Sequence, residues 1–285
     1  MPSLTVPAYA KLNLSLDVLD LRSDGYHNLR MVMQSVTLAD ELTVTVSPGS
    51  GVTMRANLPY LPSDQRNLAA AAALRFQEYT GKTCGVEITL RKSIPVCAGM
   101  GGGSSDAAAT LRALNRLTGG GLSPRELARI GESVGSDVPY CVLGGTALAE
   151  GRGEVLTPLP PLPPCTIVAC KPPFPISTPA LFGALAGKKL RRRPDTEGLL
   201  DALTNRDLTG TAQRLYNVFE DVLSPRQART VAEIKGQLVA GGALGACMSG
   251  TGPTVFGLFN DPQAAKQTAA DLRKDFEDVF LTGPV

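Results

Sequence analysis

The sequence predicts an α+β protein of two domains, on three observations. The chain has 285 residues, a length that fits one large domain or two ordinary ones. Apolar residues recur with the two-residue period of strands in some segments and with helical spacing in others. The proline-rich segment 158–164 (PLPPLPP) cannot form a helix or a central strand, because proline lacks the backbone N–H. We therefore expect a linker there, between domains over residues 1–157 and 165–285.

The first half of the chain predicts strands followed by helices. Apolar and polar residues alternate between Leu12 and Val18, as in a half-buried strand. A later helical pattern stops at Gly81, where a helix C-cap belongs, and Ser123 and Glu126 form a capping box that opens another helix. The expected strands span 4–19, 29–38, 42–46, 52–55 and 86–90, and the expected helices span 67–80, about 104–117 and about 124–134.

The second half predicts the same two kinds of element. Helical spacing prevails from about residue 178 to residue 240. Asp261 and Pro262 open a further helix, because aspartate caps helices and proline fits the first helical position. A turn is expected over 249–253, and the expected strands span 166–170, 254–259 and 279–282.

The composition limits the classes of protein. Hydrophobic residues make up 43% and charged residues 19%, which is typical of a globular chain with a core. The net charge of +2 argues against a protein that coats a polyanion. No apolar run reaches the length of a membrane span, and the N-terminus does not resemble a signal peptide. Six cysteines without a CxxC pair, and the single His27, match no zinc module. We expect a cytoplasmic protein with buried free thiols.

A basic run stands out in the second half. Five of the six residues over 188–193 are lysine or arginine. Such a run is typical of an exposed, solvated loop, and the alternative is an electrostatic attractor for an anionic substrate.

The segment around residue 100 is the most informative in the chain. Four of the five residues over 99–103 are glycine, which permits positive φ and lets consecutive N–H groups converge on an anion. A helical pattern follows directly, so the turn would deliver a phosphate to a helix N-terminus, with Ser104 and Ser105 as further donors. We expect Asp106 either to compensate the helix dipole or to contribute indirectly to metal binding. The alternative for the whole segment is a flexible glycine turn capped by serine.

Several segments resemble the motifs of the GHMP kinase superfamily. Residues 8–16, 95–111 and 246–256 are similar to its three motifs, in order along the chain. Met100 replaces the usual leucine with a residue of similar volume, and Thr251 keeps the hydroxyl where serine is commoner. Residues 22–29 and 135–139 are similar to one branch, whose members phosphorylate a cytidine diphosphate-linked methylerythritol.

The resemblance implies a fold and a reaction. The fold would be that of the GHMP kinases: an N-terminal ATP-binding domain of the ribosomal S5 domain 2 type and a ferredoxin-like C-terminal, substrate-binding domain. The reaction would transfer the γ-phosphoryl group of ATP to the 2-hydroxyl of the methylerythritol unit, in the non-mevalonate isoprenoid pathway. Mg²⁺ would accompany ATP, with most of its ligands from phosphates and water, and no protein ligand is identified. No nucleic acid, membrane or obligate protein partner is implied.

The resemblance also implies two catalytic residues. Asp137 corresponds to the catalytic aspartate of the family, a base that takes the proton of the acceptor hydroxyl and contributes about 10²–10⁴-fold. Lys11 corresponds to the catalytic lysine, which holds Asp137 ionised and offsets negative charge around the transferring group. From the residues alone, Asp137 could instead be a helix N-cap, and Lys11 a solvent-facing residue of a strand.

The resemblance also implies which residues bind ATP and which bind the cytidyl acceptor. In the family the histidine at position 27 contacts the cytosine edge and the tyrosine at position 26 stacks on the base. Phe182 could close over the nucleotide or be ordinary helix core, and Asn67 is also expected to cap a helix. The turn 249–252 is expected to approach the diphosphate or the junction of the two glycine-rich loops, or to be a simple hairpin turn. The predicted ATP-binding residues are Asn67, Pro95, Val96, Cys97, Ala98, Gly99, Met100, Gly101, Gly102, Gly103, Ser104 and Ser105. The predicted substrate-binding residues are Asn13, Tyr26, His27, Asp137, Thr178 and Phe182.

Two other hypotheses stay open. The acceptor of a GHMP kinase could be homoserine, mevalonate or a sugar, although Tyr26 and His27 favour a cytidine-bearing substrate. The N-terminal fold type also serves RNA-binding and translation proteins, so the chain could be a binding module without activity. The nearly neutral charge and the pair of Lys11 and Asp137 argue against that hypothesis.

Overall fold

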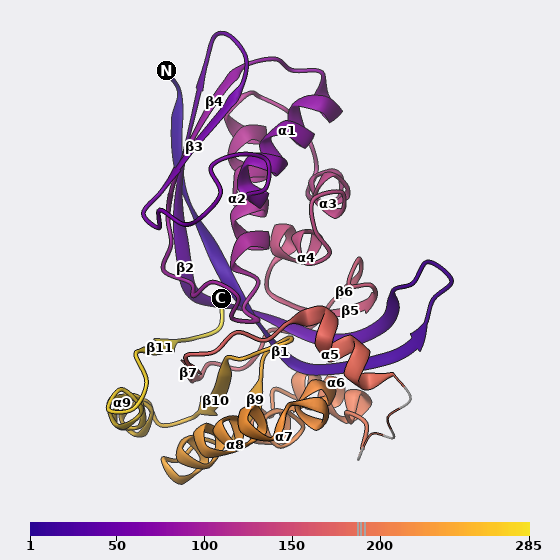
Figure 1. Cartoon of the computed structure of the whole chain (residues 1–285), viewed down its shortest axis with the longest axis vertical. Coiled ribbons are helices and arrows are strands. Elements are labelled where there is room, and N and C mark those ends of the chain that lie inside the picture. Colours follow the sequence, from indigo (N-terminus) through magenta and orange to yellow (C-terminus); the bar gives the residue numbers. More distant parts are fainter. Residues whose placement is uncertain (187, 189, 191) are drawn as a thin grey trace. The chain divides into compact units, whose positions relative to one another are not determined.

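The computed structural model describes residues 1–186, 188, 190 and 192–285 and confirms the α+β class (Figure 1). The chain forms two compact units, each assembled from separate stretches of sequence. The first unit comprises Met1–Ala10, Ala39–Val96 and Gly101–Gly144. The second unit comprises Lys11–Leu38, Cys97–Met100 and Gly145–Val285. The units do not divide at the predicted linker, and the domains 1–157 and 165–285 stay a prediction.

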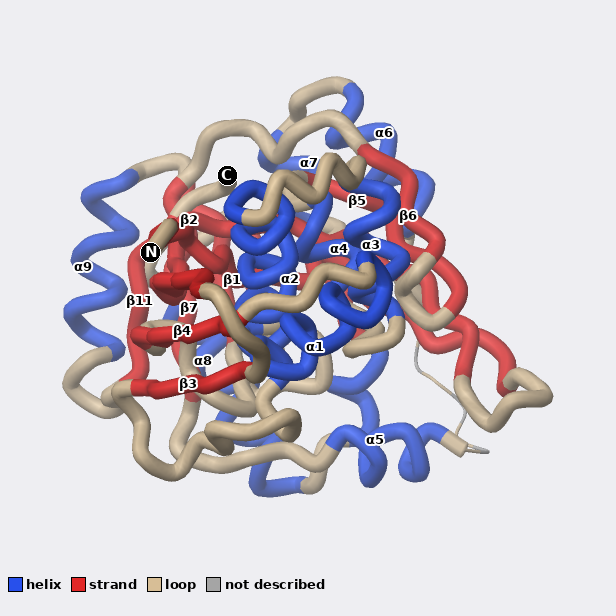
Figure 2. The backbone as a smooth tube through the Cα atoms, turned by 90° about the horizontal axis from the view of Figure 1, so that it is seen from above, coloured by secondary structure: helices blue, strands red, loops and turns tan. Residues whose placement is uncertain are grey.

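The first unit packs helices against the strands of a sheet (Figures 1 and 2). Strand β3 (Val52–Ala56) pairs in parallel with β4 (Gly85–Arg91), which pairs antiparallel with the end of β2 (His27–Ser47). The first residues of β1 (Ser3–Leu21) also belong here. Alternate apolar residues of β2 and β4 are buried, because one face of the sheet packs on the core. The helices are α1 (Leu68–Thr80), α2 (Gly102–Leu117), α3 (Pro124–Glu132) and α4 (Val138–Leu143).

The second unit contains a ferredoxin-like sheet, which confirms that part of the predicted fold. Its strands occur in the order β11–β7–β10–β9 and all pairs are antiparallel. With α8 before β9 and α9 before β11, the chain follows the β-α-β-β-α-β pattern of that fold. Figure 1 shows α8 and α9 beside this sheet. The elements are β7 (Thr166–Lys171), α8 (Pro225–Ala240), β9 (Gly245–Met248), β10 (Val255–Phe259), α9 (Pro262–Leu272) and β11 (Asp278–Thr282).

Further strands of the second unit pair with the parts of β1 and β2 that belong to it. β5 (Thr146–Gly151) pairs antiparallel with Leu29–Gln34 of β2, and β6 (Val155–Pro158) pairs with β5. β8 (Tyr216–Asn217) pairs in parallel with β1. The remaining helices are α5 (Thr178–Leu185), α6 (Thr196–Thr204), α7 (Leu208–Gln213) and the 3₁₀ helix η1 (Val218–Val222).

Most predicted elements are confirmed, two differ in their bounds, and several were not predicted. β2 is one strand where two were expected, because Asp40 is buried within it and accepts hydrogen bonds from the backbone N–H groups of Ser93 and Ile94. A buried polar residue there interrupts the apolar pattern without ending the strand. α2 begins two residues earlier than expected, at Gly102. The elements α4, β5, β6, β8, η1 and β9 were not predicted.

Candidate active site

The glycine-rich loop adopts backbone angles that suit an anion cradle. Cys97, Gly99 and Gly101 all have positive φ, between 54° and 74°. Gly101 is the N-cap of α2, and because glycine has no side chain it offers the helix no capping hydrogen bond. The N–H groups of a first helical turn have no intrahelical partners, so they are available to a negatively charged ligand. The hydroxyl of Ser105 is buried and donates to the carbonyl of Tyr9 at 2.5 Å.

The turn over 249–253 contacts this loop within the second unit. Ser249 Oγ donates to the carbonyl oxygen of Gly99 at 2.9 Å. A Cβ atom at Gly99 would collide with the carbonyl oxygen of Ser249 and lie 3.0 Å from the backbone nitrogen of Gly252. Glycine is therefore required at position 99 for space as well as for φ. The expectation that this turn lies at the junction of two glycine-rich loops is confirmed.

Lys11 and Asn13 extend the same network along β1. Lys11 is only 4% exposed, and its Nζ donates to Asn13 Oδ1 at 2.6 Å. The backbone N–H of Asn13 donates to Ser249 Oγ at 3.2 Å, and that of Lys11 donates to the Met100 carbonyl at 2.9 Å. Lys11 is therefore not a solvent-facing strand residue, and the expectation that it shares a strand face with Asn13 is confirmed.

Asn217 supports the turn from the other side. Its buried side-chain amide donates to the carbonyl oxygens of Met248 and Gly250 at 2.8 and 2.7 Å. Sequence reasoning did not single out Asn217, because β8 has only two residues and shows no periodic pattern.

Asp137 lies in the first unit, at the N-cap position of α4. Its side chain makes no capping hydrogen bond, although capping was the alternative to a catalytic role. The action of Lys11 on Asp137 stays a prediction. Asn67 caps α1 as expected, through its Oδ1 and the N–H of Ala69 at 3.0 Å, and its contact with ATP also stays a prediction.

The structure brings several predicted substrate residues together in the second unit. The rings of His27 and Phe182 are stacked, with centroids 5.2 Å apart and planes 24° apart. Phe182 also meets Phe219 edge to face at 5.0 Å, so it is neither isolated nor fully buried core. Thr178 Oγ1 and Thr251 Oγ1 lie 2.9 Å apart.

Tyr26 is exposed and has a cationic neighbour. The guanidinium of Arg152 lies 5.3 Å from the centroid of its ring. Arg152 was missed by sequence reasoning because it follows β5, a strand that was not predicted.

The structure corrects the interpretation of Asp106. Because α2 starts at Gly102, Asp106 lies beyond the first turn, where it cannot compensate the dipole well. Its Oδ2 instead accepts from Lys92 Nζ at 2.8 Å, and the same ammonium contacts Asp40. All three side chains are at most 4% exposed. Burial raises the pKa of Asp106 to about 8. The group is a buried anchor between β2 and α2.

Replacing Asp106 with asparagine should reduce the pH dependence of stability. A carboxyl group whose pKa is raised on folding binds a proton more strongly in the folded state, so its stabilisation is complete below about pH 4 and is lost as pH rises through about 8. We expect the wild type to lose on the order of 1–3 kcal/mol of unfolding free energy across this window, and Asp106→Asn to lose less. Urea unfolding at several pH values measures both. The exposed Asp271→Asn is the control, and an unchanged pH slope in Asp106→Asn would contradict the assignment.

Among the described residues, no group of three or more His, Cys, Asp or Glu side chains could hold a metal ion. Asp40 and Asp106 already face an ammonium. All six cysteines are free, but only Cys141, Cys170 and Cys247 are buried, and Cys97 is exposed in the glycine-rich loop. The expectation of buried thiols is therefore wrong for Cys97.

The basic run over 188–193 is described in part. Lys189 and Arg191 lie outside the described residues. Lys188, Arg192 and Arg193 are exposed, as an external loop requires. Arg193 pairs with Asp17 of β1 at 2.6 Å.

Comparisons with known proteins define the class of the chain. The model of the GHMP kinases N terminal domain matches residues 67–145, and that of the GHMP kinases C terminal domain matches residues 199–278. Each match lies inside one of the two predicted domains. GHMP kinases are ATP-dependent small-molecule kinases.

Relatives that match nearly the whole chain show to which family of GHMP kinases it belongs. The 4-diphosphocytidyl-2-C-methyl-D-erythritol kinase of Exiguobacterium sibiricum is 46% identical over 98% of this chain and 97% of its own length. That of Brevibacillus brevis is 44% identical over 98% and 95%. A crystal structure of 4-(cytidine 5'-diphospho)-2C-methyl-D-erythritol kinase covers 99% of both chains with a TM-score of 0.84 and 35% identity. The chain belongs to this family of GHMP kinases. A homoserine kinase from Cytophaga hutchinsonii, 22% identical with a TM-score of 0.76 over 99% of this chain and 95% of its own, shares the fold.

Proposed function

We propose that the protein transfers the γ-phosphoryl group of ATP to the 2-hydroxyl of 4-diphosphocytidyl-2-C-methyl-D-erythritol, in the route from methylerythritol phosphate to isoprenoid precursors. The observation that carries the proposal is the buried pair of Lys11 and Asn13, which Ser249 joins to Gly99 of the glycine-rich loop. This arrangement joins the three motifs of the resemblance, and full-length relatives carry the name of this kinase.

In the proposed reaction the loop over 95–105 binds the phosphates of ATP. The free N–H groups at the start of α2 and the helix dipole favour the negative charge of a triphosphate. Mg²⁺ bound to the phosphates would neutralise part of that charge, with water completing its coordination. The part of the chain that the structure describes offers no cluster of acidic ligands for it.

Asp137 and Lys11 act on the acceptor and on the transferring group. The carboxylate of Asp137 takes the proton of the 2-hydroxyl as that oxygen attacks the γ-phosphorus, and the bond from the γ-phosphorus to the bridging oxygen breaks to release ADP. The ammonium of Lys11 is desolvated and held by Asn13, so it is oriented before the reaction to offset negative charge. Such positioning and charge stabilisation account for most of the rate enhancement in phosphoryl transfer.

The stacked rings of His27 and Phe182 recognise the cytidine of the acceptor. Phe182 fixes the plane of the imidazole, so that its nitrogens can face the polar edge of the base. The exposed ring of Tyr26 stacks on the face of the base.

Replacing Phe182 with leucine should raise the KM for the cytidyl acceptor. Leucine keeps apolar bulk but loses the flat surface that holds His27, so we expect an increase of about tenfold, or about 1.4 kcal/mol. The KM for ATP should stay within twofold. Steady-state kinetics with each substrate varied in turn measures both constants. An equal rise in both KM values would place Phe182 in a general structural role instead.

Product identification tests the function as a whole. The protein is incubated with ATP and, in separate reactions, with the cytidyl acceptor, homoserine, mevalonate or a hexose, and the products are identified by mass spectrometry. Phosphorylation of the cytidyl acceptor alone is the expected result. Preferential phosphorylation of another acceptor would overturn the proposal, and RNA affinity without ATP turnover would favour a binding module.

The cellular location and the partners of the protein are also proposed. No described helix has the length and apolar character that crossing a membrane requires. We propose a cytoplasmic enzyme that needs no nucleic acid, membrane or obligate protein partner.

A further inference from the structure

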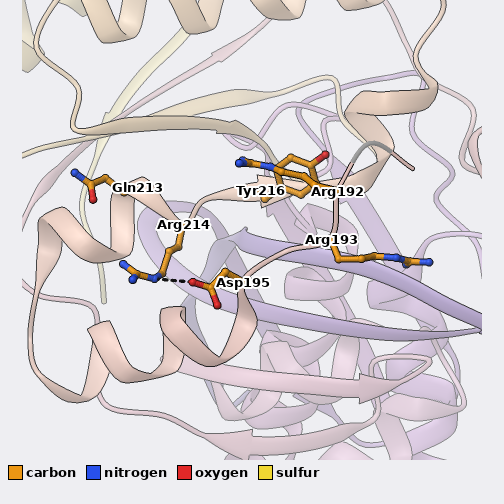
Figure 3. Close-up of a pocket in the computed structure, with 6 residues that line it drawn as sticks. All are labelled: Arg192, Arg193, Asp195, Gln213, Arg214 and Tyr216. Carbon is orange, nitrogen blue, oxygen red and sulfur yellow. Dashed lines mark hydrogen bonds and ion pairs between the residues drawn. The ribbon is translucent and has the colours of Figure 1, made fainter. Parts of the chain in front are cut away.

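The second unit contains a pocket whose lining residues differ from those proposed to bind the substrates. Its volume is about 310 Å³, which is enough for a small ligand. The lining contains none of the residues proposed to bind ATP or the cytidyl acceptor. The residues that line it come from the segment before α6, from the end of α7 and from β8 (Figure 3): Arg192, Arg193, Asp195, Gln213, Arg214 and Tyr216.

Two of the three arginines are fixed by acidic partners. Arg193 donates through Nη1 to Asp17 at 2.6 Å and to the carbonyl of Val18 at 2.6 Å, and Figure 3 shows it pointing away from Tyr216. Arg214 donates through Nε to Asp195 at 3.0 Å and through Nη1 to the carbonyl of Gly210 at 3.0 Å. These two bonds orient the guanidinium of Arg214. Across residues 1–186, 188, 190 and 192–285, its Nη2 makes no hydrogen bond.

Arg192 differs from the other two in its partner. Its guanidinium lies 4.2 Å from the centroid of the Tyr216 ring, and Figure 3 shows the two stacked. Tyr216 is itself held, because its hydroxyl donates to Asp221 at 3.1 Å. Among the described residues, no carboxylate forms an ion pair with Arg192. A guanidinium stacked on a ring keeps its N–H edge available for a bidentate contact with an oxyanion.

We propose that this pocket, whose lining shares no residue with the proposed substrate sites, binds a small phosphorylated molecule. Arg192 binds the phosphate through its N–H edge and Nη2 of Arg214 contributes a second donor. The amide of Gln213 and the ring of Tyr216 contact the rest of the ligand. A planar guanidinium matches the geometry of phosphate, and the volume exceeds that of a bare phosphate ion, so a phosphate or diphosphate ester is the class that fits best.

The pocket also suggests a role for part of the basic run over residues 188–193. The sequence suggested an exposed loop or an attractor for an anionic substrate. Arg193 is hydrogen-bonded to Asp17 of β1. Its neighbour Arg192, which stacks on Tyr216, would bind the anion.

Site-resolved NMR can test the pocket while other anion sites are present. The Nε–Hε signals of arginine side chains are recorded on the full chain and assigned for Arg192 and Arg214 with the variants Arg192→Gln and Arg214→Gln. Inorganic pyrophosphate is the probe. We expect saturable shifts of both signals with a dissociation constant of about 1 mM or lower, and no saturable shift of the exposed Arg226 in α8. Signals of Arg192 and Arg214 that do not move up to about 10 mM pyrophosphate would overturn the proposal.

Variants separate the stacked platform from general charge. Arg192→Gln and Tyr216→Ala should each weaken pyrophosphate binding in the pocket at least about tenfold, as followed by the Arg214 signal. Tyr216→Phe, which keeps the ring, and Arg226→Gln, which removes an equal charge elsewhere, should leave that affinity within about twofold. An equal loss in Arg226→Gln would indicate nonspecific attraction and overturn the proposal. Malonate that binds as well as pyrophosphate would overturn the assignment to phosphate.

The thermal midpoint of each variant shows whether it is folded. If Tyr216→Ala does not fold, Arg192→Gln decides alone, since Arg192 is exposed and its guanidinium stacks on the ring of Tyr216.

Discussion

Replacing Asp137 with asparagine is expected to lower kcat by about 10²–10⁴-fold, with the affinities for ATP and the cytidyl acceptor within several-fold of the wild type. Asparagine has nearly the same shape but cannot take a proton from the acceptor hydroxyl. Steady-state kinetics with both substrates, together with direct binding measurements, separates the two effects.

The same variant distinguishes catalysis from helix capping. Asparagine caps helices about as well as aspartate, and the Asp137 side chain makes no cap hydrogen bond. The unfolding free energy of Asp137→Asn should therefore stay within about 0.5 kcal/mol of the wild type. Asp261→Asn, at the N-cap of α9, is the matched control, and it should change neither stability nor kcat appreciably. A kcat unchanged in Asp137→Asn would remove Asp137 from the proposed role.

Replacing Gly99 with alanine is expected to disrupt the junction between the glycine-rich loop and the turn over 249–253. The methyl group would meet the carbonyl of Ser249, and the residue would keep a φ of 74°, which alanine adopts poorly. Backbone atoms cannot move aside as a flexible side chain can. We expect a loss of about 2–5 kcal/mol in unfolding free energy and a clear rise in the KM for ATP.

Gly81→Ala provides the matched control for this prediction. Gly81 has a similar φ of 66° at the end of α1, but beyond its two chain neighbours no described atom lies within 4 Å of the place where its Cβ would be. It should lose only the cost of the backbone conformation, about 1–2 kcal/mol, and leave the KM for ATP unchanged. Urea unfolding and ATP kinetics compare the two variants. Equal effects would show that conformation alone, without the contact with Ser249, requires glycine at position 99.

The sequence predicted the elements whose signals are local. The capping box at Ser123 and the C-cap at Gly81 were both confirmed, because capping depends on residues only a few positions apart. The alternation along β1 was confirmed for a similar reason, since the side-chain period of a strand is fixed by its own backbone. Short elements such as α4 and β8 were not predicted, because two to six residues are too few to show a recognisable apolar pattern.

The candidate site was predicted unevenly. Motif resemblance singled out Lys11, Asn13, His27 and Phe182, and the structure places Lys11 beside Asn13 and His27 beside Phe182. Resemblance gave no indication of Asn217, which holds the turn over 249–253, or of Arg152 beside Tyr26. Their catalytic and binding roles stay predictions.

By itself the sequence determined the α+β class, the caps and the glycine-rich loop, since each follows from conformational preferences within a few residues. Tertiary structure alone decided that Asp106 joins Lys92 and Asp40, and that Ser249 reaches Gly99 across 150 positions of sequence. Burial and hydrogen bonding act between side chains that meet only after folding, so the pKa of Asp106 and the need for glycine at position 99 depend on neighbours that no local pattern encodes.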